Sequence, residues 1–261
     1  MPELFFLIIS QEERAKHHRS FFILYPMNVF YTPTIASDHF TLSEEESKHC
    51  VRVLRMGAGE ELVLVDGRGG FYKAVIENAD PKKCSVKIVE EQKEFGKRSH
   101  FLHIACAPTK NIERFEWFLE KATEMGIDGI TPLICDHSER SSVKNERLEK
   151  VIVSAMKQSL KAYLPELNEA VKFTEMIKMD FDGKKFIAHC AEGEKKHLKE
   201  LIRPGEKILI LIGPEGDFSL KEIELALQNG FVQVSLGPSR LRTETAALAA
   251  CHTVNLMNEQ C

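Results

Sequence analysis

The sequence predicts an α/β protein with two parts, a small β domain and a larger domain built on a parallel sheet. First, segments 61–67, 70–77 and 84–90 are short and alternating or β-branched, with Gly-rich and Asp-Pro-Lys turns between them, which is typical of a small antiparallel barrel or sheet. Second, the polar run at 90–100 has the composition of a linker. Third, strand patterns then alternate with long helical patterns, which predicts a parallel sheet covered on both faces.

The composition is that of an ordinary globular chain. Its 261 residues, 43% of them hydrophobic and 28% charged, are enough for two domains. A net charge of −4 argues against a protein that coats nucleic acid by bulk basicity, so any RNA contact must be local. No apolar run reaches the ~18 residues of a membrane-spanning helix, and MPELFFLIIS lacks a basic leader and a cleavage site. We therefore expect a cytoplasmic protein that binds no membrane.

The cysteines and histidines indicate neither a disulfide framework nor a metal site. The seven cysteines are odd in number, widely spaced and without a C-x-x-C pair. The ten histidines show no ligand spacing. We expect most cysteines to be small buried side chains, and we expect no metal.

The start of the first domain has two interpretations. Residues 1–26 show no clean periodicity, whereas a coherent pattern begins at Met27. Either Met27 is the functional start, or residues 1–26 are a short ordered extension. In both cases we place the small β domain at residues 27–96 and the larger domain at residues 97–261.

A helix is predicted over residues 41–56, with Ser43 as its N-cap. In a regular helix Lys48, Arg52 and Arg55 share one face, at positions i, i+4 and i+7. This stripe either binds RNA phosphates or is a solvated face.

The elements expected after the linker alternate in type. In order they are strand 101–107, helix 111–126, strand 127–135, helix 145–163, and strands 184–190 and 207–213. In such sheets ligands usually bind at the carboxyl ends of the strands.

The last fifty residues contain two loops that are rich in glycine, proline and polar residues. A buried strand ends at Gly213, and the helix that follows has a capping box of Ser219 and Glu222 at its start. Strand 231–236 leads into a second loop, 237–242, and a final helix. Both loops open with Gly-Pro, so together they can wall a pocket at one edge of the sheet.

Spacing alone leaves two interpretations of these loops. No G-x-G-x-x-G or G-x-x-x-x-G-K-[ST] motif is present, so the loops could be well-formed turns without a ligand. Against this, Arg242, Thr243, Glu244 and Thr245 form a polar cluster at the start of the last helix. Exposed polar residues clustered on a loop belong to a functional site more often than to a hydrophobic core.

Four separated segments resemble one family: HCVRVLRMGAGEELVLVDG, PTKNIERFEWFLEKATEMGIDGITPL, LIGPEGDFS and LGPSRLRTETAALAA. They are similar to the 16S ribosomal RNA uridine-N3 methyltransferases of the SPOUT superfamily, whose catalytic domain is tied in a trefoil knot. The resemblance covers nearly the whole chain from Met27. It implies a PUA-like RNA-binding β-barrel at 27–96, a knotted α/β domain at 97–261, S-adenosyl-L-methionine as methyl donor, 16S rRNA in the small ribosomal subunit as substrate, and a homodimer. The strand and helix pattern does not itself predict a knot.

The resemblance also implies which residues bind the donor. They are His189, Ile212, Gly213, Pro214, Glu215, Gly216, Leu236, Gly237, Pro238, Leu241, Thr243, Thr245 and Ala246. The chain departs from the family pattern at three places, with Gly216-Asp217 for Gly-Gly, Ser239-Arg240 for Arg-Ile and Leu160-Lys161 for Gly-Arg. At the third place Lys161 keeps the positive charge but loses the planar fork of an arginine.

Arg242 and Glu244 are the candidate catalytic residues. Methylation of N3 requires loss of the imide proton, and a fixed guanidinium such as that of Arg242 would stabilise the resulting negative charge by about 3 to 4 kcal/mol. Arg242 could instead pair with Glu244 and only shape the loop. Glu244 could be the general base, but a helix N-terminus favours the charged carboxylate and makes it a poorer base. A structural role for Glu244 is equally well supported.

The candidate RNA contacts are Lys48, Arg52, Arg55, Lys110 and Lys161. Lys110 follows the first strand of the larger domain and could contact RNA or a carboxylate. Trp117 has many apolar neighbours in its helix, so we expect it in the core or at a dimer surface.

Two other functions stay open. A 2′-O-ribose methyltransferase of the same superfamily is the nearest, but those enzymes resemble N-x-G-x-x-R and S-L-N-x-S where this chain has NIERFEWF and LRTET. The chain could also be a non-catalytic RNA-binding or ribosome assembly factor, which would have no need to bind the methyl donor.

Overall fold

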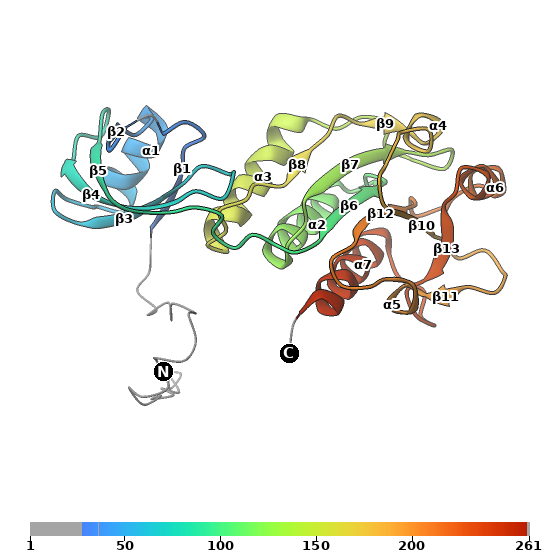
Figure 1. Cartoon of the computed structure of the whole chain (residues 1–261). Coiled ribbons are helices and arrows are strands. Elements are labelled where there is room, and N and C mark those ends of the chain that lie inside the picture. The colour runs from blue at the N-terminus through green and yellow to red at the C-terminus, as the bar shows by residue number, and fades with distance from the viewer. Residues whose placement is uncertain (1–27, 36, 260–261) are drawn as a thin grey trace, which may run out of the picture.

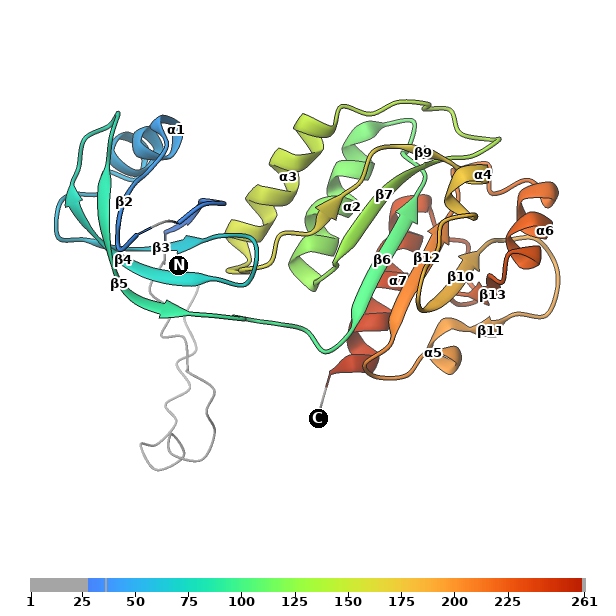
Figure 2. The ribbon, with the colours of Figure 1, turned by 45° about the horizontal axis from the view of Figure 1, so that its top comes forward.

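The computed structural model describes residues 28–35 and 37–259, which form two domains (Figure 1). A turned view shows the same separation, with the segment between β5 (Ser85–Gln92) and β6 (Phe101–Cys106) running from one domain to the other (Figure 2). Residues 1–26, whose two interpretations are given above, lie outside the described part of the chain.

The first domain is a five-stranded curled sheet. Its strands are β1 (Val29–Tyr31), β2 (His39–Thr41), β3 (Glu61–Val65), β4 (Phe71–Asn78) and β5, in the order β1-β3-β4-β5-β2. The pairs β3-β4, β4-β5 and β5-β2 are antiparallel, as predicted, but β1 pairs parallel with β3. A parallel pair needs a crossover connection, and here the chain passes through β2 and a helix between the two strands. The sheet is therefore an open half-barrel of mixed type.

The helix predicted over residues 41–56 is shorter and changes its pitch. The Ser43 hydroxyl caps α1 (Glu44–Lys48) by accepting a hydrogen bond from the backbone N–H of Glu46 at 3.2 Å. A π-helical turn, η2 (His49–Val53), continues the helix and ends it.

This change of pitch makes the predicted single-face stripe of basic residues wrong. A π turn takes more residues than an α turn, which rotates Arg52 relative to Lys48. Arg55 lies beyond the helix with a left-handed φ of 58°, and Lys48 pairs with Glu44 at 2.6 Å. The role of these three residues in RNA binding stays a prediction, but a shared helix face does not support it.

The two domains share an apolar contact. Val29, Val63, Val65 and Phe71 from the first domain pack against Met156 and Ala162, at and beyond the end of α3 (Asn145–Gln158). Polar bonds across the contact join Gly69 N to Ala162 O at 2.9 Å, Leu164 N to Gly67 O at 2.9 Å, and Lys157 Nζ to Glu46 Oε1 at 2.8 Å. The end of α3 therefore fixes the half-barrel against the second domain.

The second domain is built on a parallel sheet, as predicted. Besides β6, its strands are β7 (Gly129–Ile134), β8 (Glu166–Leu167), β9 (Val171–Lys172), β10 (Lys184–Ala188), β11 (Lys196–His197), β12 (Lys207–Ile212) and β13 (Val232–Ser235). The order is β11-β13-β10-β12-β6-β7-β8, with β9 paired to β7, and every described pairing is parallel. The carboxyl ends of β13, β10 and β12 therefore meet side by side at one edge.

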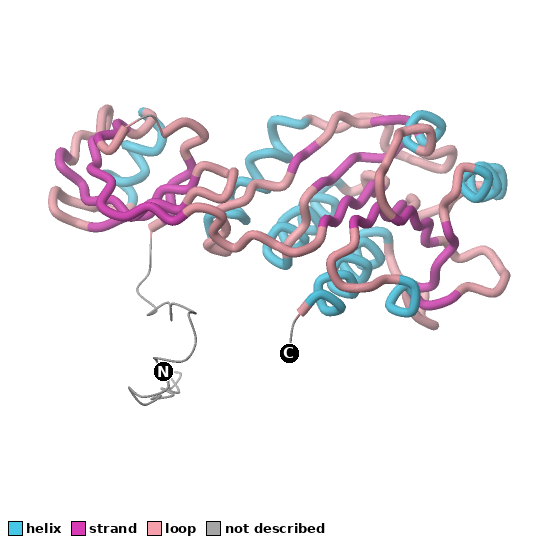
Figure 3. Tube along the Cα trace, in the orientation of Figure 1, coloured by secondary structure: helices cyan, strands magenta, loops and turns pink. Residues whose placement is uncertain are grey.

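Helices cover both faces of this sheet (Figure 3). One core contains side chains of α2 (Ile112–Met125), α3, α5 (Leu198–Leu201) and α7 (Thr243–Asn258). The core on the opposite face contains side chains of α4 (Phe173–Met176) and α6 (Leu220–Gln228). After β13 the chain returns to pack α7 against α2, β6 and β12. The α/β fold class is thus confirmed, and the knot stays a prediction from the resemblance.

The helix predicted over 145–163 ends earlier, because α3 stops at Gln158. Leu160 then adopts a left-handed φ of 55°, which turns the chain into the contact between the domains. This is the position where the resembling family has glycine. Glycine adopts such a φ freely, whereas another residue loses about 1 to 2 kcal/mol there.

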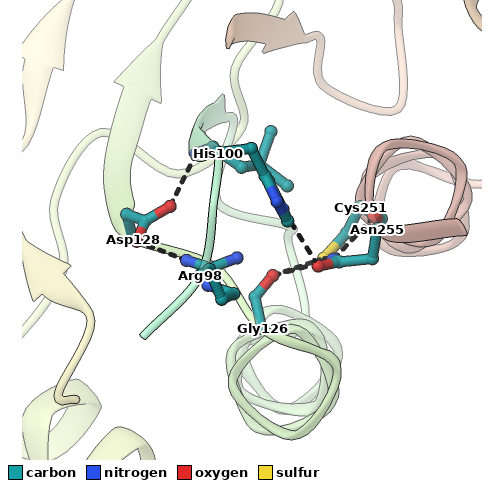
Figure 4. A network of polar contacts seen from close by, with 7 residues as sticks. Arg98, His100, Gly126, Asp128, Cys251 and Asn255 are labelled. Carbon is teal, nitrogen blue, oxygen red and sulfur yellow. Dashed lines mark hydrogen bonds and ion pairs between the residues drawn. The ribbon is translucent and has the colours of Figure 1, made fainter. Parts of the chain in front are cut away.

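A polar network joins the linker to α7 (Figure 4). Arg98 forms an ion pair with Asp128. The side-chain amide of Asn255 donates a hydrogen bond to the Gly126 carbonyl at 2.8 Å, and its oxygen lies 3.3 Å from Nε2 of His100. The segment just before β6, the end of α2 and the C-terminal part of α7 are therefore held together, which anchors the helix whose first turn carries the candidate catalytic residues.

Candidate active site

A cavity of about 630 Å³ lies at the carboxyl ends of β10, β12 and β13. Its walls are the two Gly-Pro loops, and this volume is typical of a small-molecule site. The residues predicted to bind the donor that line it are His189, Ile212, Gly213, Pro214, Glu215, Gly216, Leu236, Gly237, Pro238, Leu241, Thr243 and Ala246, and Arg242 lines it too. Thr245 does not line this cavity. The structure thus brings together nearly all of the predicted set.

Sequence reasoning missed several lining residues. They are Ala188, Cys190, Lys195, Asp217, Val234, Ser235, Ser239 and Arg240. Lys195 comes from the loop after β10, where its Nζ donates to the carbonyl oxygens of His189 at 2.8 Å and Ala191 at 2.6 Å. That loop carries no motif, and only its position after a central strand could have indicated it.

The loop after β12 is held in shape by Asp217. This residue has a left-handed φ of 61°, a conformation that aspartate tolerates better than most residues. Its carboxylate accepts hydrogen bonds from the backbone N–H groups of Cys190 at 2.7 Å and Phe218 at 2.8 Å. The φ explains why the resembling family has glycine here, and the bond to Cys190 ties together two loops that wall the cavity.

The predicted capping box at the start of α6 is confirmed and extends beyond its own helix. Ser219 and Glu222 cap each other's backbone N–H groups. Glu222 also accepts a hydrogen bond from the backbone N–H of Asp136 at 2.9 Å, and the Ser219 hydroxyl donates to the Asp136 carboxylate at 2.7 Å. The loop after β12 is therefore braced against the loop after β7, which gives the cavity a rigid wall.

A second concave region, of about 600 Å³, adjoins the cavity. It is lined by Asn111, Glu113, Arg114, Trp117, Arg240, Leu241, Arg242, Glu244 and Thr245. Arg240, Leu241 and Arg242 line both regions. Trp117 is 44% exposed, so the expectation of a core position is wrong and a surface role remains.

Arg242 and Glu244 differ in environment. Arg242 is exposed at the N-terminal end of α7, and its backbone carbonyl accepts a hydrogen bond from Ala246 at 2.7 Å. Glu244 is buried, and its Oε2 has no hydrogen-bond partner among the described residues. No ion pair joins the two side chains in this part of the chain. A brace between Arg242 and Glu244 is therefore not observed.

The predicted RNA contacts in this domain have different surroundings. Lys110 is exposed beside the cavity, where its Nζ pairs with Glu139 at 2.7 Å and its backbone N–H donates to Glu215 at 3.0 Å. Lys161 is half-buried near Arg98, and burial together with that guanidinium lowers the pKa of the Lys161 amine. Because it is partly covered by the protein, Lys161 is less available for RNA than the exposed Lys110.

Residues 28–35 and 37–259 contain neither a cluster of metal-ligating side chains nor a helix that could span a membrane. No group of three or more His, Cys, Asp or Glu side chains there is arranged to hold a metal ion. In the same stretch, no helix has the length and apolar character needed to cross a membrane.

Known proteins share both the domain order and the fold. Residues 97–255 match the RNA methyltransferase domain family, and residues 42–89 match the RNA methyltransferase PUA domain family. Ribosomal RNA small subunit methyltransferase E of Rickettsia conorii is 31% identical over 234 residues, which cover 87% of this chain and 91% of that protein.

Two solved structures extend the comparison. A structure described as a "probable rRNA-methyltransferase" from Porphyromonas gingivalis is 44% identical, with a TM-score of 0.83 over 89% of this chain and 98% of its own. Ribosomal RNA small subunit methyltransferase E from Neisseria gonorrhoeae, bound to S-adenosyl methionine, is 26% identical, with a TM-score of 0.81 over 89% of this chain and 98% of its own. The chain therefore belongs to the RNA methyltransferase family that includes ribosomal RNA small subunit methyltransferase E.

Proposed function

We propose that this protein uses S-adenosyl-L-methionine to methylate N3 of a uridine in 16S rRNA of the small ribosomal subunit, and that it does so in the cytoplasm, where ribosomal subunits are assembled. The observation that carries the proposal is the pair of adjoining concave regions that share Arg240, Leu241 and Arg242. One region is walled by the two Gly-Pro loops and suits the donor. The other is open at the surface beside Arg242 and suits the target base.

The residues of the first region fit the donor. Residues of the loops at 213–216 and 236–238 line a cavity that is large enough for a nucleoside, and the buried Nδ1 of His189 has no partner among the described residues. The donor, when bound, supplies a methyl group activated on a sulfonium sulfur. The curated relatives support the choice of rRNA as substrate.

Arg242 and Glu244 are proposed to act on the base. Loss of the N3 proton leaves negative charge on the uracil ring, and the exposed guanidinium of Arg242 can stabilise that charge where the two regions meet. The unpartnered Oε2 of Glu244 can accept the N3 proton. Because Glu244 is buried, this step requires the carboxylate to turn toward the concave region that it lines.

A methyl-transfer assay tests this function. Purified small subunits and free 16S rRNA are incubated with labelled donor, and the product nucleosides are separated. N3-methyluridine is the expected product. Recovery of a 2′-O-methylated nucleoside would instead identify a ribose methyltransferase, and absence of both transfer and donor binding would leave a non-catalytic RNA-binding factor.

Lys48, Arg52 and Arg55 of the first domain are proposed to bind RNA phosphates. We expect Arg52→Ala combined with Arg55→Ala to weaken RNA binding and to reduce the slope of log K against log salt by about 1 to 2, because each phosphate contact releases about one counterion. Filter binding over a salt series measures this slope, and calorimetry should show unchanged donor affinity. Lys82→Ala combined with Lys83→Ala, in the exposed turn between β4 and β5, is the matched control. An unaltered slope in the arginine variant would show that Arg52 and Arg55 do not contact RNA phosphates and are only solvated.

A homodimer is proposed to form through the neighbouring helices α2 and α7. Three large hydrophobic side chains on these helices are exposed, Trp117 at 44%, Met125 at 43% and Leu256 at 52%. We expect Trp117→Glu to shift the sedimentation coefficient from that of a dimer to that of a monomer, because it replaces an exposed apolar contact with a charged side chain. Leu220→Glu, on α6 at 71% exposure, is the control. Wild-type protein that sediments as a monomer would contradict the proposal.

A further inference from the structure

A buried imidazole nitrogen lies beside the donor cavity without a partner. His189 directly follows β10, is only 9% exposed and lines the cavity. Its Nδ1 is buried and makes no hydrogen bond to any described residue. Leaving a buried polar atom without a hydrogen bond costs roughly 1 to 3 kcal/mol. Such an atom in a residue that lines a cavity is therefore expected to bond to a ligand.

A chain of hydrogen bonds fixes which proton this imidazole carries. Gln233 on β13 donates its amide N–H to the backbone carbonyl of Glu194 at 3.2 Å. Because a carbonyl can only accept, this bond turns the Gln233 oxygen toward Nε2 of His189, 3.2 Å away. Nε2 must then carry the hydrogen, and Nδ1 is left as an acceptor.

The charges around His189 keep the ring neutral. Burial, and next the ammonium of Lys195, lower the pKa of His189, while the bond to Gln233 and the carboxylate of Asp217 raise it by less. The pKa lies below the usual 6.5, so the ring is a neutral acceptor at physiological pH. Lys195 lines the same cavity and would repel a second cation placed beside it. The partner of Nδ1 is therefore an uncharged N–H or O–H group.

We propose that His189 Nδ1 accepts a hydrogen bond from the adenosine part of the methyl donor, through its amino group or a ribose hydroxyl, and that Gln233 is the positioning residue that holds the acceptor tautomer. Nδ1 is covered in this conformation, so the proposed contact requires a small shift of the imidazole toward the cavity that keeps the bond between Nε2 and Gln233. The inference rests on the proposed function, because it assigns part of the same donor site.

Three substitutions test the acceptor. Calorimetry with S-adenosyl-L-methionine should show that His189→Phe weakens binding about 5- to 100-fold, the cost of one lost buried hydrogen bond. His189→Asn should recover most of the affinity, because its Oδ1 replaces Nδ1 as an acceptor. His103→Phe is the matched control, since His103 is a partly buried histidine on β6 that contacts Thr131 at 2.7 Å and does not line the cavity.

The pH dependence separates an acceptor from a merely structural ring. Wild-type affinity should be constant above the pKa of His189 and should fall as the pH drops through it, because protonation turns the acceptor into a donor. Gln233→Glu should move this fall to higher pH, since a carboxylate beside Nε2 raises the pKa of the ring. His189→Asn should show no such fall. 5′-Methylthioadenosine, which lacks the amino acid, should reproduce these differences.

Two measurements decide the outcome even if a variant is unstable. In ¹⁵N-histidine NMR spectra of the wild-type protein, His189 Nδ1 should appear as an unprotonated nitrogen whose signal moves on addition of donor; an Nδ1–H signal would overturn the inference. Equal donor affinity of a folded His189→Phe variant would also overturn it. A loss seen only with S-adenosyl-L-methionine would move the contact to the amino acid part and refute the adenosine assignment. If the wild-type chain bound no donor at all, the proposed function itself would fail.

Discussion

Gly213→Val is expected to abolish donor binding. A Cβ atom at Gly213 would lie 3.0 Å from Cδ2 of Phe218 and 3.2 Å from its backbone nitrogen. Phe218 is buried in the core beneath the loop and packs against Phe173 with ring centroids 5.5 Å apart. The branched side chain of valine would therefore force Phe218 and the adjoining loop at 214–217, which walls the cavity, to shift. We expect calorimetry to show at least ~100-fold weaker binding of S-adenosyl-L-methionine, the loss of about 3 kcal/mol.

The same substitution should cost some stability, which must be separated from the binding effect. Overpacking of a core costs about 1 to 3 kcal/mol, so thermal unfolding should show a lower but still cooperative transition. Gly57→Val is the matched control, because the nearest atom to its Cβ is 3.8 Å away and belongs to the flexible side chain of Glu60. A folded Gly213→Val variant with wild-type donor affinity would show that this loop does not contribute to donor binding.

Local signals in the sequence predicted the elements that depend on local chemistry. Helix 111–126 begins and ends where expected, because Asn111 caps α2 and Gly126 supplies the φ of 111° at its end. The capping box at Ser219 and Glu222 was predicted for the same reason. The edge that carries the cavity followed from the alternation of strands and helices, since the carboxyl ends of parallel strands meet on one side.

Tertiary contacts decided the features that the sequence could not predict. Over five residues the π-helical turn at His49–Val53 cannot be distinguished from a regular helix by its apolar spacing. The prediction that Lys48, Arg52 and Arg55 share one helix face was therefore wrong. The parallel pairing of β1 with β3 joins segments separated by more than thirty residues. Gln233 lies in an ordinary strand pattern, and its bond to His189 arises only because β10 and β13 are neighbours.

The Arg242→Lys variant is expected to lose methyl-transfer activity but to bind the methyl donor and RNA with near wild-type affinity. Arg242 lines both the donor cavity and the adjoining concave region, and it is exposed and forms no ion pair among the described residues. Its guanidinium is therefore free to contact a base placed beside the methyl donor. Lysine keeps the charge but not the planar fork. Loss of a contact made mainly in the transition state should lower kcat about 100- to 1,000-fold.

Single-turnover rates and donor affinities of matched variants distinguish catalysis from loop bracing. With saturating donor and RNA, Arg242→Lys should bind both within about twofold of wild type, because a role confined to the transition state leaves ground-state binding unchanged. Arg147→Lys, at an exposed arginine on α3, should transfer methyl groups normally. Glu244→Gln should lower the rate if Glu244 removes the N3 proton. If both Arg242→Lys and Glu244→Gln instead weaken donor binding, the pair braces the loop, and a near wild-type rate for Arg242→Lys would contradict its electrostatic role.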